Sequence, residues 1–394
     1  MIRFLTAGES HGPALTAIVE GLPAGLAISP EDINHQLRRR QKGYGSGGRM
    51  SIEKDRVRIT SGVVEGRTTG APVALHVENR DYANWQEKTI APMSIPRPGH
   101  ADLTGALKYG YPDLRYSLER ASARETAMRV VVGAFCRKLL EHFGVMLGGY
   151  VVQIGGVSVE VDPERSYKER FSQAESNDLR SPVKAAISDL RDEIFAAKTE
   201  KDTLGGIVEI VALGLPPGLG SHVHYDRRLD GQLVGALVSI PAFKGAEIGA
   251  AFDNATRRGS EVHDPMTRDK EGTLHRTSNR AGGLEGGITN GQPLVLRAAM
   301  KPISTVLKSL PSVNLASGEE EPTVFERSDF CALPRAVPIA EAMVAFVLAN
   351  ALLDKLGGDS LAEMTPRFEK LAGNRLEDFS LRDQPWSFGY PHDS

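Results

Sequence analysis

The stretch Arg120-Ala-Ser-Ala-Arg-Glu-Thr-Ala-Met-Arg129, followed by the apolar run from Val130 to Phe143, joins a cluster of arginines and hydroxyls to a helical pattern. Ser122 and Glu125 have the spacing of a capping box, which predicts a helix that begins at Ser122 and stops at Gly144. A helix N-terminus carries unpaired N–H groups and the positive end of the helix dipole. With arginines beside it, this terminus favours an anion such as phosphate. A capped surface helix with solvated arginines is the alternative.

The composition is that of an ordinary globular chain. Its 394 residues are 41% hydrophobic and 25% charged, with a formal net charge of -3 at pH 7. This balance provides no broad basic face, so nucleic acid is not an expected partner. The two cysteines, Cys136 and Cys331, cannot form a disulfide framework and suit a reducing, cytoplasmic compartment. The chain opens without a signal pattern, and the apolar stretch 342–353 is too short to span a bilayer, so no membrane association is expected.

Three further helices are expected from capping and helix-breaking residues. One begins at Ser29-Pro30 and ends at the basic residues 38–40, one follows Ser181-Pro182, and one runs from Pro338 to the glycines 357–358. Residues 340–356 are apolar nearly all round, which predicts burial on most sides. Apolar β-type runs predict strands at 56–61, 73–77, 207–213 and 293–298.

Two parts of the chain share a pattern of turns. Gly21-Leu-Pro-Ala-Gly-Leu26 matches Gly214-Leu-Pro-Pro-Gly-Leu219, and the segment 65–75 resembles 285–296 with one residue more in the second copy. An Arg-Ala pair then leads into an apolar helix, at Arg120 and again at Arg335. We interpret this pattern as a diverged internal duplication, with chance recurrence of turn residues as the alternative.

The expected fold is therefore α/β, with two similar halves at about 1–150 and 205–360 related by a pseudo-two-fold axis. The halves are expected to form one domain over 1–394. The polar segments 155–205 and 255–280 are expected to be mobile insertions.

Two histidines follow glycines in short turn motifs, Gly8-Glu-Ser-His-Gly12 and Arg97-Pro-Gly-His-Ala-Asp102. Histidine titrates near pH ~6.5, so His11 and His100 can donate or accept a proton at working pH. Asp102 is close enough in the sequence to orient the His100 imidazole. A hydrogen-bonded turn histidine is the alternative for each. Ser10 beside His11 does not indicate a hydrolase triad, because adjacent residues of an extended chain point apart.

Several segments could hold an anion or a cofactor. The glycine loop Gly43-Tyr-Gly-Ser-Gly-Gly48 follows a predicted helix, whereas a dinucleotide-binding loop would follow a strand. We therefore interpret it as a flexible loop that can bring residues 38–40 and Arg49 together around an anion. Lys301-Pro-Ile-Ser-Thr305 offers one cation and two hydroxyls for a phosphate or the polar edge of a cofactor. The glycines 282–287 would let a flat ring lie against the backbone. Asp329 beside a basic site should stay ionised.

A metal site is not expected. His222-Val-His224-Tyr-Asp226 has possible ligand spacing, but no second ligand cluster is evident, and Asp226 fits as the N-cap of the next helix. The inventory of many arginines and two accessible histidines indicates a site that binds a multiply anionic small molecule and moves protons.

Six of these segments occur in the order found in the chorismate synthase family, which the chain resembles from about residue 6 to 358. They are Gly8–Gly12, Arg97–Asp102, Arg120–Arg129, Gly282–Gly287, Lys301–Thr305 and Asp329–Cys331. The resemblance implies 1,4-anti elimination of phosphate from 5-enolpyruvylshikimate 3-phosphate to give chorismate, the last common step toward the aromatic amino acids. It implies reduced FMN as cofactor without net redox change. It also implies central helices sandwiched between sheets, and a homotetramer.

The same resemblance implies roles for individual residues. His11 is expected to protonate the departing phosphate, and His100 the reduced flavin. Asp329, with Ser10 and Ser122, is expected to form a relay around flavin N5, which accepts the ring proton. The flavin contacts are expected at Arg120, Ala121, Ser122, Pro241, Ala242, Gly286, Lys301, Pro302, Ile303, Ser304, Thr305 and Arg327.

The remaining implied contacts involve the substrate and a nicotinamide nucleotide. Arg40 and Ser46 match a pair that contacts NADP or substrate, and substrate anions are expected at Arg40, Arg49, Arg97, Arg124 and Arg129. Ser46 replaces a common arginine, which weakens the NADP contact and leaves NADPH as an optional source of reduction. Pro241 replaces a common polar residue, so only its backbone could serve.

Two other functions compete with this one. The first is a flavoprotein oxidoreductase that acts on an anionic small molecule in the same pocket. The second is a non-enzymatic binder of an anionic ligand, with the arginines in structural roles.

Overall fold

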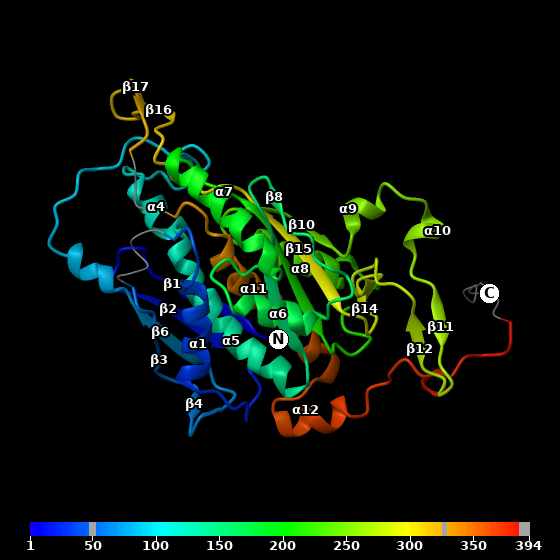
Figure 1. Cartoon of the computed structure of the whole chain (residues 1–394). Helices are drawn as coiled ribbons and strands as arrows, with labels where there is room; N and C mark the ends of the chain where they lie inside the picture. The colour runs from blue at the N-terminus through cyan, green and yellow to red at the C-terminus, as the bar shows by residue number, and fades with distance from the viewer. Residues whose placement is uncertain (47–52, 325–328, 386–394) are drawn as a thin grey trace, which may run out of the picture.

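The structure is a computed structural model that describes residues 1–46, 53–324 and 329–385. It has a mixed α/β fold with two main antiparallel sheets (Figure 1). One sheet has the order β1-β2-β6-β3 and the other the order β10-β15-β9-β7-β8. Their strands are β1 Arg3–Ala7, β2 Ala14–Glu20, β3 Val57–Ile59, β6 Val73–Glu78, β7 Met146–Ile154, β8 Val157–Ser158, β9 Gly206–Leu213, β10 Phe243–Ile248 and β15 Leu294–Met300. The four predicted strands are confirmed as β3, β6, β9 and β15, with small shifts at their ends.

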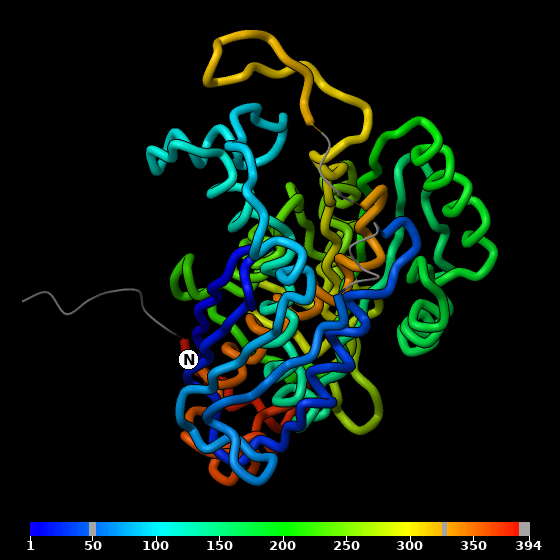
Figure 2. Tube along the Cα trace, turned by 90° about the vertical axis from the view of Figure 1, so that its left-hand side faces the viewer, coloured from blue at the N-terminus to red at the C-terminus, as the bar shows by residue number. Residues whose placement is uncertain are grey.

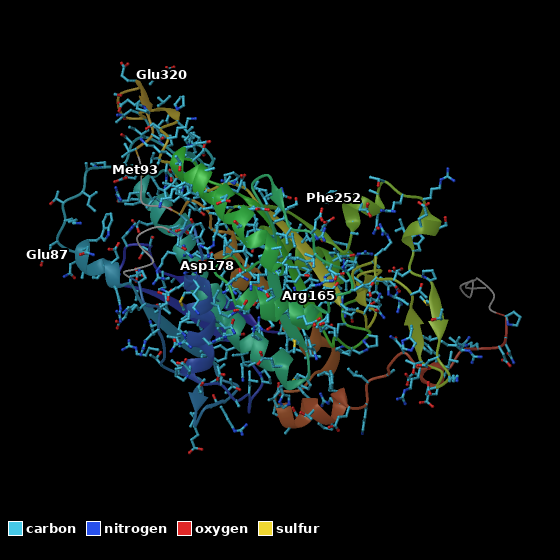
Figure 3. The ribbon with its side chains drawn as sticks, viewed as in Figure 1. Glu87, Met93, Arg165, Asp178, Phe252 and Glu320 are labelled. Carbon is cyan, nitrogen blue, oxygen red and sulfur yellow. The ribbon has the colours of Figure 1, made fainter. Side chains whose placement is uncertain are left out.

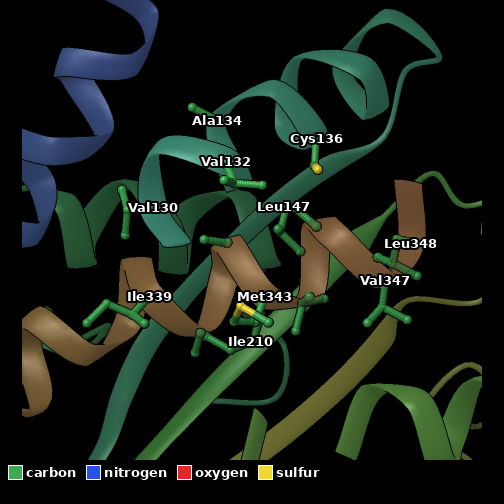
Figure 4. Packing of buried hydrophobic residues seen from close by; sticks show 14 of the residues in the cluster. Val130, Val132, Ala134, Cys136, Leu147, Ile210, Ile339, Met343, Val347 and Leu348 are labelled. Carbon is green, nitrogen blue, oxygen red and sulfur yellow. The ribbon is translucent and has the colours of Figure 1, made fainter. Parts of the chain in front are cut away.

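Four helices supply most of the packing against these sheets: α1 Pro30–Gln41, α5 Thr126–His142, α8 Leu229–Val238 and α11 Leu333–Leu356. Helix α5 contacts β1 and β2, whereas α11 contacts β7 and β9. The two helices also pack against each other through buried aliphatic side chains (Figure 4). Burial of these apolar faces removes them from water, which is the main favourable term in folding.

The first predicted helix, α1, is confirmed at both ends. Ser29 Oγ accepts a hydrogen bond from the Asp32 N–H, while the Asp32 carboxylate accepts one from the Ser29 N–H at 2.8 Å. Pro30 occupies the first turn, where its missing N–H has no cost. Residues 38–40 form the last turn, as the charge pattern predicts.

The expected start of α5 is wrong. A separate helix, α4 (Arg115–Ala121), runs directly up to Ser122, and a short 3-10 turn, η2 (Ala123–Glu125), then leads into α5 at Thr126. Glu125 does not close a capping box on Ser122, because its carboxylate accepts a hydrogen bond from Arg129 Nε at 2.7 Å instead. Ser122 Oγ caps the 3-10 turn through the Arg124 N–H at 3.4 Å.

Helix α11 begins five residues before the predicted Pro338, at Leu333. Pro334 takes the favoured place in the first turn, and Pro338 follows one turn later, where it removes a single backbone hydrogen bond. This helix is long and apolar enough to pass a length-and-composition test for a membrane span, but 89% of its apolar window is buried inside the protein. It is a core helix, so the predicted burial is confirmed.

The two turn motifs that resemble each other build the same local structure. In the first, Thr68 Oγ1 accepts a hydrogen bond from the Leu26 N–H at 2.9 Å and donates to the Pro23 carbonyl at 2.6 Å. In the second, Thr289 Oγ1 accepts from the Leu219 N–H at 2.8 Å and donates to the Pro216 carbonyl at 2.7 Å.

Each threonine is the last residue of a short hairpin in which each strand has two residues. The first hairpin pairs β4 (Val63–Val64) with β5 (Arg67–Thr68), and the second pairs β13 (Leu284–Glu285) with β14 (Ile288–Thr289). Both hairpins have the same length, so the expected extra residue in the second copy is wrong.

The remaining elements lie around this frame. The polar segment 155–205 folds into β8, α6 and α7, which pack on β7, and α7 is the helix expected after Pro182. Their bounds, with those of the other small elements, are η1 Arg80–Asn84, α3 Asp102–Tyr109, α6 Tyr167–Glu175, η3 Lys184–Ala186, α7 Ile187–Thr199, η4 Tyr225–Arg227, α9 Ala251–Asn254, α10 Gly259–Val262, β11 Met266–Arg268, β12 Leu274–Arg276, β16 Pro311–Val313, β17 Glu320–Pro322, α12 Leu361–Phe368 and η5 Leu376–Asp378.

Two segments extend away from the sheets and contact each other at one end of the molecule (Figure 2). One is the segment 85–114, and the other is the segment 305–324 with the hairpin β16–β17. Ser312 Oγ donates to the Pro96 carbonyl at 2.6 Å, and the Leu315 N–H donates to the Ser94 carbonyl at 3.0 Å. Met93 and Glu320 mark the two segments in Figure 3.

Gly133 allows α5 and α11 to approach closely, because a Cβ at this position would lie 2.3 Å from the Cβ of Ala342. We therefore expect Gly133→Ala to reduce the free energy of unfolding by about 1–3 kcal/mol through overpacking, despite the better helix propensity of alanine. Urea unfolding would measure the loss. Gly231→Ala, in α8 with open space around the new methyl, is the matched control and should be neutral or stabilising. Equal stability of the two variants would contradict this account of the helix crossing.

Candidate active site

His11 sits in a short turn between β1 and β2 that is tied down from two sides. Asn79, at the end of β6, donates through Nδ2 to the carbonyl of Glu9 at 3.1 Å and to that of Gly12 at 2.8 Å. The Ser10 N–H donates to the Glu119 carbonyl at 3.1 Å. Gly8 has φ +111°, and a Cβ there would lie 2.5 Å from the Ala14 carbonyl oxygen, so the turn requires glycine at its start.

The His11 side chain is held by a carboxylate and an indole. Its Nδ1 lies 2.8 Å from Glu119 Oε1, and its backbone N–H donates to Glu119 Oε2 at 2.7 Å. The ring lies against Trp85, with ring centroids 4.1 Å apart. Ser10 Oγ lies 3.0 Å from Ser122 Oγ, which joins the turn to the start of α5.

His100 is held in the same way by a second carboxylate. Its Nδ1 lies 2.6 Å from Asp102 Oδ1, as its place in the sequence suggests. Arg97 grips the same carboxylate through Nε at 2.8 Å and Nη2 at 3.0 Å, and reaches Thr305 Oγ1 through Nη1 at 3.0 Å. Burial opposes ionisation of Asp102, but the hydrogen bonds from His100 and Arg97 prevail and hold its pKa well below the ordinary value.

Three arginines from different elements gather with two carboxylates at the end of α1. Arg124 donates to both oxygens of Asp55 at 2.8 Å and to Asn79 Oδ1 at 2.8 Å. Arg335 donates through Nε to the Arg40 carbonyl at 3.1 Å and pairs with Asp329 through Nη1. This network fixes the geometry of the site before any ligand arrives.

Arg40 is the least satisfied member of this cluster. Its side chain is 2% exposed and donates to Thr126 Oγ1 and to the Ala123 carbonyl. Nη1 has no hydrogen-bond partner within the described part of the chain, and the nearest carboxylate oxygen is 3.7 Å away on Asp55. Burial, followed by repulsion from Arg335, lowers its pKa to about 9. An anion beside Nη1 would relieve both effects.

A second cationic segment lies at the end of β15. The Lys301 N–H donates to the carbonyl of Ala242 at 2.9 Å. Ala242 has φ +71°, an unusual backbone conformation for a residue with a side chain, and such strain is typical of ligand sites. Burial and the neighbouring Lys244 lower the pKa of Lys301, and the hydrogen bond described for its ammonium goes to the Pro302 carbonyl at 3.4 Å. These features fit the phosphate and the polar edge of a flavin.

The described contacts join some of the predicted site residues to one another and others to residues that were not predicted. Contacts join Ser10 to Ser122, Arg40 to the Ala123 carbonyl, Asp329 to Arg335, and the His100 segment to Thr305. Arg129 reaches Ser239, two residues before Pro241. Arg120 turns to Thr6 at an exposed position instead. Gly286 lies in the β13–β14 turn beside His222. Ser46 Oγ donates to the Gly43 carbonyl at 2.7 Å. Arg49 and Arg327 lie outside the described residues.

Sequence reasoning did not identify four residues that hold the site, namely Asp55, Asn79, Glu119 and Arg335. Arg335 was noted only as part of the repeated Arg-Ala pair. Glu119 precedes the arginine motif directly, and Arg335 belongs to the repeated Arg-Ala pair, so both had a signal. Asp55 and Asn79 had none, because their importance comes only from contacts across the fold. In the other direction, the expected N-cap role of Asp226 is wrong, since η4 intervenes and Arg228 precedes α8.

The described residues contain no group of three or more histidine, cysteine, aspartate or glutamate side chains that could hold a metal ion. The pair His224–Asp226 is exposed, with Nδ1 and Oδ1 2.8 Å apart. It stays a surface ion pair.

The comparisons with known proteins agree with one another. The family model described as chorismate synthase matches residues 2–353. Curated proteins called chorismate synthase from Aquifex aeolicus (strain VF5) and Trichlorobacter lovleyi are 51% and 54% identical, each over 96% of this chain and over 99% and 100% of their own length. A crystal structure of chorismate synthase has a TM-score of 0.77 at 45% identity and covers 93% of this chain and 96% of its own.

The Asp102 cluster predicts a pH dependence of stability. A carboxyl whose pKa is depressed in the folded state stabilises the fold above its unfolded pKa of about 3.9, and this contribution is lost as the pH falls below that value. In Asp102→Asn, the free energy of unfolding should therefore fall less steeply between about pH 5 and pH 3 than in the wild type. At neutral pH it should be lower by about 3 kcal/mol, because Arg97 stays buried without its carboxylate.

Urea unfolding at several pH values measures both effects. Asp189→Asn, at an exposed position in the first turn of α7, is the control and should follow the wild-type curve. An unchanged acid slope in Asp102→Asn would refute the electrostatic account.

Proposed function

Because the chain belongs to the chorismate synthase family, it is a carbon–oxygen lyase of amino-acid biosynthesis, and we propose that the site around His11, His100 and Arg40 carries out its reaction. That reaction is the 1,4-anti elimination of phosphate from 5-enolpyruvylshikimate 3-phosphate, which gives chorismate. The observation that carries the proposal is that two imidazoles are each bound through Nδ1 to a carboxylate, and that a buried arginine supports each of them. Arg97 binds the carboxylate of Asp102, and Arg124 binds Asn79, which holds the turn that carries His11.

In the proposed mechanism, His11 donates a proton to the departing phosphate. Glu119 occupies its Nδ1, so the proton leaves from Nε2. The phosphate gains negative charge as the carbon–oxygen bond breaks, and prearranged cations stabilise that charge without further reorganisation. Arg40 is the chief candidate, because its Nη1 lacks a hydrogen bond among the described residues.

We assign the other arginines to two different roles. Arg129 is proposed to stabilise the substrate anions together with Arg49. Arg97 and Arg124 are proposed to position their neighbours, because Asp102 and Thr305 already bind the guanidinium of Arg97, and Asp55 and Asn79 already bind that of Arg124. A charged group satisfied in this way holds its neighbours in place more than it attracts a ligand.

The family implies a requirement for reduced flavin, and we propose FMN held by Pro241, Ala242, Gly286, Arg327, the segment Lys301–Thr305 and the segment Arg120–Ser122 at the end of α4. When bound, it supplies an electron-rich ring that assists expulsion of the phosphate. His100 is proposed to supply a proton at the flavin from Nε2, because Asp102 occupies Nδ1. Ser10, Ser122 and Asp329 are proposed to move the proton that leaves the substrate ring.

A nicotinamide nucleotide is not part of this proposal. Arg40 is almost fully buried, and the Ser46 hydroxyl is engaged within its own loop. Neither contact supports NADPH at this place. The alternative of an oxidoreductase gains no specific support from the described contacts, and flavin spectra distinguish it: the lyase should keep its flavin reduced before and after many turnovers.

We also propose that the fold arose by duplication and encloses its central helices between the two sheets as one domain over 1–394. The strand orders β1-β2-β6-β3 and β7-β9-β15-β10 correspond, as do the threonine-capped hairpins. Packing of α5 on β1 and β2, and of α11 on β7 and β9, supports the sandwich. A homotetramer and a cytoplasmic location follow the family pattern and stand as proposals, with segments 155–205 and 255–280 as insertions.

His11→Ala should lower kcat by about 10²- to 10⁴-fold, the usual contribution of a general acid. Phosphate release from 5-enolpyruvylshikimate 3-phosphate, under anaerobic conditions with reduced FMN, measures the loss. His142→Ala, at the exposed end of α5, is the control and should retain full turnover. Wild-type turnover that is equally fast without reduced flavin would overturn the proposed function.

Arg40→Gln should lower kcat/KM by about 10- to 150-fold, which corresponds to the loss of one charged hydrogen bond worth roughly 1.5–3 kcal/mol. Steady-state kinetics in the same assay test this, with circular dichroism to establish folding. Arg227→Ala, an exposed arginine 3.5 Å from Asp354, is the control and should leave kcat/KM unchanged. A folded Arg40→Gln variant with wild-type kcat/KM would remove Arg40 from the anion site.

A further inference from the structure

Glu119 contacts His11 through both oxygens of its carboxylate, and the mechanism above uses it only to place the departing proton on Nε2. Oε1 lies 2.8 Å from His11 Nδ1, and Oε2 accepts the His11 N–H at 2.7 Å. We propose that Glu119 is a positioning residue that fixes the tautomer of His11 and keeps its imidazole protonated until the phosphate departs. The proposal rests on the proposed function of His11 as the acid.

The chemistry of the two groups determines the tautomer. An ionised carboxylate only accepts hydrogen bonds, so Nδ1 must carry the proton that it shares with Glu119. The neutral imidazole therefore has its free lone pair on Nε2, and the imidazolium carries its transferable proton there. After His11 gives up that proton, the Nδ1–H tautomer remains, and Glu119 already stabilises it.

The backbone around Glu119 makes this contact rigid. Glu119 lies in α4, and its own carbonyl accepts the Ser10 N–H at 3.1 Å, so one residue holds both Ser10 and His11. Asn79 ties the carbonyls of Glu9 and Gly12 on either side of them. Trp85 covers the imidazole and is itself fixed, because its Nε1 donates to Asp81 at 3.1 Å.

The groups around the pair keep Glu119 ionised. Burial opposes ionisation of Glu119, but its hydrogen bonds with His11 prevail and lower its pKa, so it stays a carboxylate at working pH. Arg115, one turn earlier in α4, also lowers this pKa. On the other sides lie the Glu9 carboxylate, folded back toward Gly12, and the Asp81 carboxylate behind Trp85.

The Glu119 carboxylate differs from that of Asp102, which contacts His100, in its hydrogen-bond partners. The Asp102 carboxylate shares its charge between His100 and three hydrogen bonds from Arg97. Every hydrogen bond described for the Glu119 carboxylate comes from His11. A proton on His11 is therefore the positive charge that compensates this carboxylate most directly. This arrangement suits a general acid, which must be protonated before the reaction begins.

Nitrogen-15 NMR of the full-length protein, labelled at histidine and compared with His11→Ala for assignment, reads the tautomer directly. In the wild type, neutral His11 should be the Nδ1–H tautomer. In Glu119→Gln, a neutral amide replaces the carboxylate, so the Nδ1–H tautomer should lose population. The basic limb of the pH–rate profile should move to lower pH, and turnover above that limb should fall about tenfold.

Asp226→Asn is the matched control. Asp226 also contacts a histidine Nδ1 at 2.8 Å, but this pair is exposed and outside the site, so only the His224 signal should change and turnover should stay at the wild-type level. If Glu119→Gln fails to fold, the tautomer of neutral His11 in the wild type still tests the proposal. A neutral His11 with its proton on Nε2 would overturn the proposal, as would an unchanged pH–rate profile in a folded Glu119→Gln variant.

The outcomes also separate this proposal from the function on which it rests. Full activity of His11→Ala with an Nδ1–H tautomer in the wild type would remove His11 from catalysis and leave the Glu119 contact as a structural one. Loss of activity in His11→Ala, combined with an unchanged pH profile in Glu119→Gln, would leave the acid in place and refute the positioning role.

Discussion

The buried ion pair between Arg124 and Asp55 is the contact on which the site depends. Arg124 comes from the 3-10 turn η2 before α5, and Asp55 comes from the segment before β3. Asn79, whose Oδ1 accepts a hydrogen bond from Arg124 Nε, directly follows β6. Asn79 in turn holds the turn that carries His11. Removing one partner of such a pair leaves an uncompensated buried charge, which costs about 3–5 kcal/mol. The pair therefore couples the position of His11 to the packing of the core helix.

The same region stores electrostatic repulsion that a ligand can relieve. Arg40 lies near Arg335 and Arg124, and its lowered pKa reflects burial and these neighbours more than the attraction of Asp55. The polar groups are held in place by α1, α5 and α11, which pack through apolar contacts that need no ligand. The fold thus keeps the arginines together at a free-energy cost, and an anion that binds there recovers part of it.

The sequence predicted those features that are local. The Ser29 capping box, the strands and the all-round apolar helix α11 follow from spacing within about ten residues. The start of α5 failed because Ser122 and Glu125 had the right spacing, but α4 and Arg129 compete for the same groups. Asn79 and Glu119 were missed for a different reason. Their partners are about 70 and 108 positions away, and no periodicity encodes such contacts.

The two threonine-capped hairpins have the same hydrogen bonds, and the sheets to which they are joined have corresponding strand orders. By the alignment of these hairpins, Asn79 at the end of β6 corresponds to Met300 at the end of β15, which is buried and apolar. A thioether cannot donate to two carbonyls as the Asn79 amide does. The hairpins and strand orders therefore correspond, whereas the amide that holds the His11 turn has no counterpart at Met300.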